Sequence, residues 1–316
     1  MIVVCPKCGA TNRIPDLAEP GKRYRCGKCE TRLTHTSKAA DAKDEGSVVL
    51  QPAAAEENKA RVVGIAFLYL LGVAVAEAFV YFIDSTLGAL CYAGILVAII
   101  IHSRRVTEYR SRMFLFSLAI VPLYRIISVL AWRVASALDI QSDLAAGAFI
   151  SSFLLVACVV LMRLAKFEPR EVGLATGKPP SQLLIGLSGV IFGPALYYIA
   201  KPEPLIPELT WAQLIIGAFV LLIGAGAEEL AFRGILQRTS TEAFGLLGLL
   251  YVSLLFALLH FGDVSGLNLS VIGIPFIFAV ALFYSWVVRG TGSLLGVTLS
   301  HLITNIIFYL VAPLAF

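Results

Sequence analysis

Charged residues are scarce in this sequence, and their scarcity argues against an ordinary soluble fold. Only 15% of the 316 residues are charged and 58% are hydrophobic, whereas soluble domains are nearer one quarter charged and one half apolar. The net charge of +4 is too small to indicate a nucleic-acid partner. Residues 1–60 are polar, so we expect no secretory signal peptide. An integral membrane protein surrounded by lipid bilayer is the class that remains.

Hydrophobic runs of membrane-spanning length occupy the chain from Val62 onward. Crossing a bilayer requires about 20 apolar residues per helix. The sequence therefore predicts an all-α polytopic membrane protein with about eight or nine transmembrane helices. We expect N-terminal transmembrane helices at 61–165 and a second transmembrane core at 180–316. The nine candidate spans are residues 62–83, 86–102, 113–137, 144–164, 183–200, 211–230, 246–261, 271–288 and 293–315.

Basic residues gather in alternate loops of this predicted topology, whereas the loops on the opposite side hold only one basic residue, Lys201. The positive-inside rule then places the N-terminus in the cytoplasm and the C-terminus outside. We expect a bacterial inner or plasma membrane. The basic residues that set this orientation are Arg104, Arg105, Arg110, Arg112, Arg163, Lys166, Arg170, Lys178, Arg233, Arg238 and Arg289.

Four of the six cysteines lie in the first 29 residues, as two CxxC pairs separated by 17 residues. The pairs are Cys5/Cys8 and Cys26/Cys29, and this spacing is typical of a four-thiolate structural zinc site. Disulfides or redox dithiols are the alternatives, and a reducing cytoplasm disfavours disulfides. We therefore predict a small β zinc ribbon at 1–35, followed by a flexible linker at 36–60.

The ribbon resembles the N-terminal zinc ribbons of many bacterial membrane and regulatory proteins. That resemblance implies no particular ligand. A protein partner of the ribbon and a bare folding or docking module are both open.

Few ionisable residues interrupt the predicted spans. Glu77 and Arg125 fall at comparable depths in the first half, where a buried ion pair that fixes helix packing is expected and a substrate contact is the lesser alternative. In the second half, Glu228 and Glu229 follow a run of apolar residues. Helical spacing pairs Glu229 with Arg233 at i, i+4. Glu228 is rotated by about 100° and is left for chemistry.

Two of the only four histidines lie downstream on apolar spans, His260 and His301. Asn305 shares a helix face with His301 at i, i+4. A lone intramembrane histidine is most often a packed, hydrogen-bonded residue. One carboxylate and two imidazoles together can bind a divalent metal that activates water. Alternatively, Glu228 can act directly as a general base on water, with histidine and Asn305 stabilising an oxyanion.

The three motifs EExxxR, FxxxH and HxxxN occur in this order across 180–316, and together they resemble the CPBP family, the CAAX-protease and bacteriocin-processing proteins also called Abi-like. The resemblance implies an intramembrane endopeptidase that acts on a protein or peptide substrate at the membrane. Carried over position by position, it implies catalytic roles for Glu228, Glu229, Arg233, His260, His301 and Asn305. The family is commonly classed as metalloproteases, which would make Glu228, His260 and His301 metal ligands, but a metal-free glutamate mechanism is also argued.

Counting residues from the cytoplasmic side raises a difficulty for this site. Glu228 and His301 lie within about eight residues of that face, whereas His260 is about 14 residues into its span, or roughly 20 Å deep. The three side chains can meet only if the seventh span starts later or tilts.

Two other classes of protein fit parts of the sequence. A non-proteolytic membrane scaffold or immunity protein could keep the same core and use its zinc ribbon for recognition. A small-ion transporter could use Glu and His as ligands, but the chain shows no inverted repeat. Nothing in the sequence indicates a prenylated substrate.

Overall fold

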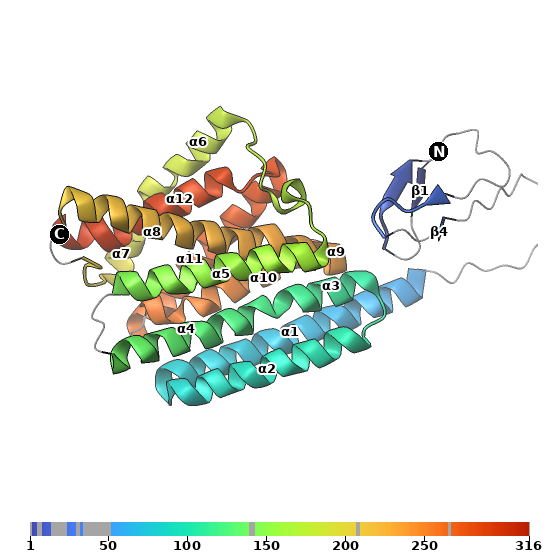
Figure 1. The fold of residues 1–316 in the computed structure, drawn as a ribbon, viewed down its shortest axis with the longest axis horizontal. Coiled ribbons are helices and arrows are strands. Elements are labelled where there is room, and N and C mark those ends of the chain that lie inside the picture. Colours follow the sequence, from blue (N-terminus) through green and yellow to red (C-terminus); the bar gives the residue numbers. More distant parts are fainter. Residues whose placement is uncertain are drawn as a thin grey trace, which may run out of the picture.

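The computed structural model describes residues 2–4, 8–13, 24–29, 32–33, 52–138, 143–206, 209–264 and 267–315. Within these ranges, eight helices are long and apolar enough to cross a membrane. The predicted all-α polytopic class is therefore confirmed. The helices pack side by side in one bundle, with the N-terminal strands beside the end where α3 and α9 lie (Figure 1).

The first half of the bundle consists of five helices, and the second half is more broken. The first five are α1 (Pro52–Phe82), α2 (Ser85–Arg105), α3 (Tyr109–Leu118), α4 (Ile120–Ala137) and α5 (Asp143–Ala165). After the short 3-10 helix η1 (Pro169–Val172) come α6 (Pro179–Leu187), α7 (Gly189–Ala200), α8 (Trp211–Glu229), the π-helix η2 (Leu230–Leu236), α9 (Gln237–Phe244), α10 (Leu247–Leu259), η3 (Phe261–Val264), α11 (Leu267–Thr291), α12 (Leu295–Ile306), η4 (Ile307–Val311) and α13 (Ala312–Ala315).

Two short antiparallel hairpins form the N-terminal unit. Strand β1 (Ile2–Val4) pairs with β2 (Thr11–Arg13), and β3 (Tyr24–Arg25) pairs with β4 (Arg32–Leu33). The two strands of each hairpin flank one of the two CxxC pairs, as a ribbon requires, although Cys5 lies outside the described residues. Helix α1 begins at Pro52, so residues 52–60, which we assigned to the linker, are helical.

The predicted Glu77–Arg125 ion pair is confirmed in the first half. Arg125 Nε and Nη2 donate to the two carboxylate oxygens of Glu77, each at 2.6 Å. Tyr92 donates a further hydrogen bond to Glu77, and Arg125 also donates to Tyr81. Such a bidentate pair with additional donors meets the conditions under which a buried ion pair is tolerated. It joins α1, α2 and α4 in the first half.

The predicted end of the sixth span was wrong, whereas the predicted limits of the seventh, 246–261, nearly match α10. Correcting the sixth span removes the difficulty over the depths of Glu228 and His260. Helices α8, η2 and α9 form one continuous apolar helix, Trp211–Phe244, rather than ending near residue 230. Glu228 therefore lies about 24 Å from the Phe244 end at the helical rise. Helix α10 has only 13 residues, too few to cross a membrane, and His260 follows its last turn at about 20 Å from its start. Glu228 and His260 thus reach similar depths, without the tilt we invoked.

Close backbone contact fixes α12 against α7. A Cβ atom added at Gly189 would overlap the carbonyl oxygen of Ser300 and lie 2.8 Å from Cβ of Ile303. The hydroxyls of Ser188 and Ser300 share a hydrogen bond of 2.8 Å at the same place. The next residue along α12 is His301, so this approach sets the position of a predicted site residue.

Replacing Gly189 with alanine should therefore destabilise the protein by about 1–3 kcal/mol, the usual cost of inserting a methyl group into a filled interior. Thermal unfolding in detergent measures the effect. Gly94→Ala is the matched control, because an added Cβ at Gly94 meets nothing within 4 Å. Equal tolerance of both substitutions would show that α7 and α12 are not closely packed.

Candidate active site

Glu228 lies between the two histidines that the sequence singled out. Its Oε2 atom is 3.7 Å from His260 Nε2 and 3.8 Å from His301 Nε2. The three side chains come from α8, from the residue after α10, and from α12. The structure therefore brings together three residues that are up to 73 positions apart in the chain (301 − 228).

Glu229 lies behind this trio and contacts both Arg233 and His301. Its Oε1 atom accepts a hydrogen bond from Arg233 Nη1 at 3.1 Å, as the i, i+4 spacing predicts. The same oxygen is 2.9 Å from His301 Nδ1, a contact that the sequence did not reveal. Glu229 is fully buried and Arg233 nearly so. Glu229 thus joins a structural arginine to a site histidine.

The second histidine is oriented by its own helix. His260 Nδ1 lies 2.8 Å from the carbonyl oxygen of Phe256, one turn earlier. The two rings also contact each other in a tilted arrangement, with centroids 4.2 Å apart and planes inclined by 33°. The Arg233 guanidinium carbon also lies 4.1 Å from the centroid of the Phe256 ring, which is a cation–π distance. Phe256 therefore positions both His260 and Arg233.

These partners determine which imidazole nitrogens carry hydrogen. A carbonyl oxygen and a carboxylate paired with arginine can only accept, so His260 and His301 each donate from Nδ1. In neutral rings, both Nε2 lone pairs then face Glu228. Each Nε2 atom lies within 4 Å of the same Glu228 oxygen, and these acceptors repel that oxygen unless a donor or a cation lies among them. A water molecule with its two hydrogens, a shared proton, or a metal ion meets that need.

The local helix changes geometry where these residues lie. The segment from Leu230 to Leu236 is a π-helix, a form that occurs mostly as short insertions in α-helices and is frequent at functional sites. At Gly234 an added Cβ would come within 2.8 Å of the Val172 carbonyl oxygen, so η1 packs tightly against this turn. The widened turn carries Arg233 inward between Glu229 and Phe256.

The trio opens into a cavity of about 420 Å³ between the two halves of the bundle. Asn305 lines this cavity one turn from His301, and its side chain makes no hydrogen bond to the described residues. Helices α4 and α5 supply part of the wall through residues such as Arg125 and Ser151. The site is therefore not built by residues 180–316 alone. Glu229 and Arg233 do not line the cavity and lie behind it.

Tyr284 is a lining residue that the sequence analysis missed. It shares a 2.8 Å hydrogen bond with Ser300, and its ring lies 5.7 Å from the Arg233 guanidinium carbon. The only signal in the sequence was a phenol hydroxyl within an apolar span. Tyrosines of that kind usually need a hydrogen-bond partner, but the partner cannot be read from the sequence.

Two places offer metal ligands, and they differ in fit. The sulfur atoms of Cys8, Cys26 and Cys29 all lie within 4.8 Å of one another. Tetrahedral zinc with bonds of about 2.3 Å requires sulfurs about 3.8 Å apart, so these residues suit it. Among the described residues, no other group of three metal-binding side chains brings its ligand atoms this close together. Glu228, His260 and His301 have suitable atoms for a divalent ion, but these atoms are spread more widely than the three sulfurs.

Comparison with known proteins adds one finding. Residues 210–307 match the family model described as type II CAAX prenyl endopeptidase Rce1-like. The match covers about a third of the chain and contains all six predicted catalytic residues, so the predicted resemblance is confirmed over this range. It supports an intramembrane endopeptidase role. No curated protein and no solved structure matches the chain.

Proposed function

Because the core is similar to the type II CAAX prenyl endopeptidases over residues 210–307, we propose that this chain hydrolyses peptide bonds of a membrane-associated protein or peptide. The single observation that carries the proposal is the position of Glu228 between His260 Nε2 and His301 Nε2 at the wall of a cavity. A carboxylate held among acceptors is suited to take a proton from water.

The proposed reaction begins with a water molecule that donates one hydrogen to Glu228. Its oxygen attacks the substrate carbonyl as the proton passes to the carboxylate, and the carbonyl oxygen becomes an oxyanion. Asn305 donates to that oxyanion from its amide. Glu228 then returns the proton to the leaving amine, so that water and a peptide bond become a carboxyl group and an amine. The enzyme is unchanged at the end.

Glu229 and Arg233 act in this scheme through His301. An ionised carboxylate on Nδ1 fixes the ring orientation and stabilises the imidazolium form, as in other histidine–carboxylate pairs. His301 can therefore hold a proton at Nε2 beside Glu228. Arg233 pairs with Glu229 at 3.1 Å in a fully buried setting and so holds the carboxylate in place against His301. His260 lies on the other side of Glu228 from His301, and the Phe256 carbonyl oxygen fixes the orientation of its ring.

The spacing of the trio favours this glutamate-based mechanism over a metal-dependent one. A divalent ion bound by Glu228, His260 and His301 would polarise the carbonyl and make a bound water a stronger nucleophile. The three side chains would have to move closer together to hold such an ion. The cysteine group needs no such movement. We propose that zinc is structural and is held by Cys8, Cys26 and Cys29, with Cys5 as the fourth ligand.

Metal analysis of the purified full-length protein separates the two mechanisms. We expect one zinc per chain, lost in Cys26→Ser and retained in His260→Ala, because a structural zinc site binds through its thiolates. A second equivalent of divalent metal that disappears in His260→Ala would establish the metal-dependent mechanism instead. Chelator treatment of the Cys26→Ser variant provides the complementary test.

We further propose that the N-terminal unit and the α3/α9 end of the bundle face the cytoplasm, in a bacterial inner or plasma membrane. The support is the gathering of arginines in the connections at that end. The activity itself is tested by comparing peptide termini in membranes that contain the wild type or the Glu228→Gln variant. Fragments that require Glu228 identify substrates and support proteolysis.

A further inference from the structure

We propose that the N-terminal ribbon is an intramolecular clasp, which docks across α3 and α9 through the turns that carry its cysteines and thereby steadies the helix containing the candidate site. The inference depends on the structural zinc proposed above but not on peptidase activity. The ribbon would be a metal-dependent part of the membrane core, rather than a separate recognition module.

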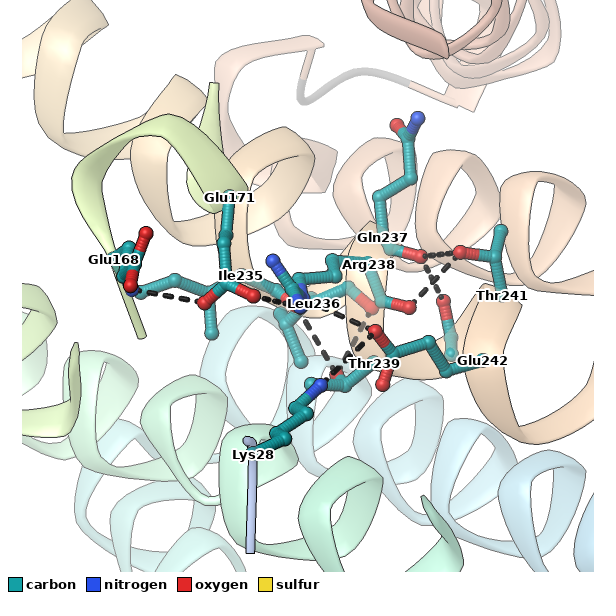
Figure 2. Close-up of polar contacts among 11 residues, drawn as sticks. Lys28, Glu168, Glu171, Ile235, Leu236, Gln237, Arg238, Thr239, Thr241 and Glu242 are labelled. Atoms are coloured by element: carbon teal, nitrogen blue, oxygen red, sulfur yellow. Dashed lines mark hydrogen bonds and ion pairs between the residues drawn. The ribbon is translucent and has the colours of Figure 1, made fainter. Parts of the chain in front are cut away.

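Each cysteine turn of the ribbon contacts a different helix. Lys28, between Cys26 and Cys29, places Nζ 4.0 Å from Oε1 of Glu242 in α9 (Figure 2). Gly9, directly after Cys8, packs so closely against the Arg110 guanidinium that an added Cβ would overlap it. Gly9 also has a φ of +67°, which favours glycine.

The two contacts lie on opposite sides of a seam between the halves of the bundle. Arg110 belongs to α3 in the first half, and Glu242 belongs to α9 in the half that carries Glu228. Across the seam, the rings of Phe114 and Phe244 meet edge to face with centroids 5.1 Å apart. A ribbon docked on both helices therefore bridges the two halves whose interface forms the cavity.

The contact at Glu242 continues into a charge network on the catalytic half. Arg238 Nε donates to Glu242 at 3.1 Å, and Arg238 Nη2 donates to Glu171 in η1 at 2.9 Å (Figure 2). Burial alone would raise the pKa of Glu171, but a hydrogen bond from the Glu168 backbone and the charges of Arg238 and Lys28 together hold that pKa below its ordinary value. Lys28 thus joins an existing network of alternating charge.

This network leads directly to the candidate site along one helix. Helix α9 continues η2 without a break, so Arg238 lies little more than one turn beyond Arg233. Arg233 in turn holds Glu229, which contacts His301. Movement of α9 relative to α3 would therefore change the support of His301. The clasp acts on the positioning of the site and contributes no group to its chemistry.

The contact is suited to reversible docking. The side chains of Lys28 and Glu242 are 30% and 32% exposed, so water and salt weaken their attraction. Because both partners belong to one chain, even a weak contact remains populated. Zinc fixes the turns that present Lys28 and Gly9, since so small a unit cannot keep its fold without metal. Loss of the metal should therefore release the clasp.

Hydrogen–deuterium exchange of the full-length, zinc-loaded protein in detergent tests this proposal. We expect Lys28→Glu to increase amide exchange in α9 by up to about five-fold, the scale of a surface ion pair, while zinc content stays unchanged. Lys201→Glu makes the same charge change outside the interface and should leave α9 unaffected.

Cys26→Ser provides the second arm of the test. It should lose zinc and raise exchange in both α3 and α9 at least as much as Lys28→Glu. Unchanged exchange in α9 in both Lys28→Glu and Cys26→Ser would overturn the clasp. Neither readout requires substrate cleavage, so this failure is distinct from failure of the proposed peptidase activity.

Discussion

Glu228→Gln should abolish peptide-bond cleavage, with a loss of about 1,000-fold or more, within the range expected when a general base is removed. The amide keeps the shape of the side chain and can still occupy the space between His260 and His301. It cannot accept the proton that water must give up. Cleavage of a substrate identified from membrane peptides, measured in proteoliposomes, provides the rate.

Two companion variants make this result interpretable. Glu203→Gln removes an exposed carboxylate outside the cavity lining and should leave the rate unchanged. His260→Ala should lose activity like Glu228→Gln while the protein still inserts in the membrane. Retained activity in both Glu228→Gln and His260→Ala would exclude the mechanism. A scaffold or immunity protein would then be the better interpretation, and there Cys5→Ser should impair function more than Glu228→Gln.

Arg233→Met should destabilise the folded protein by about 3–5 kcal/mol, the usual cost of removing one partner of a buried ion pair. The Arg233 and Glu229 side chains are both 0% exposed, so no water can replace the lost contact. The guanidinium also packs against the rings of Phe256 and Tyr284, and methionine retains only part of that packing. Chemical or thermal unfolding in detergent measures the loss.

The double variant Glu229→Gln/Arg233→Met separates the charge effect from packing. Because it leaves no unpaired buried carboxylate, it should be more stable than Arg233→Met alone. Arg289→Met removes an exposed arginine and should change stability by less than about 0.5 kcal/mol. If Arg233→Met were as well tolerated as Arg289→Met, the buried pair would have no structural role.

Local patterns in the sequence were sufficient to predict several of the contacts. The i, i+4 spacing of Glu229 and Arg233 predicts their pairing, because that geometry is fixed within one helix. The CxxC spacing likewise predicted a small β unit at 1–35, and all four described strands lie there. Comparable depth in the first and third predicted spans was enough to suggest the pairing of Glu77 with Arg125.

Contacts between distant segments could not be read in the same way. The sixth span was predicted to end near residue 230 because Arg233, Gln237 and Arg238 lower the local hydropathy. Arg233 and Gln237 are in fact buried inside the protein, so the helix continues to Phe244. The contact of His301 with Glu229 depends on how α12 packs against α8. Periodicity within either helix carries no information on that packing.

Hydrolysis in heavy-oxygen water is the measurement that tests the role of Glu228 most directly. Wild-type protein in proteoliposomes should produce a fragment whose new C-terminal carboxyl group carries one heavy oxygen, and the Glu228→Gln variant should produce no such fragment. Equal formation of the labelled fragment by the variant would contradict the account. So would a wild-type fragment that carries no label, because its peptide bond would then have been broken without water.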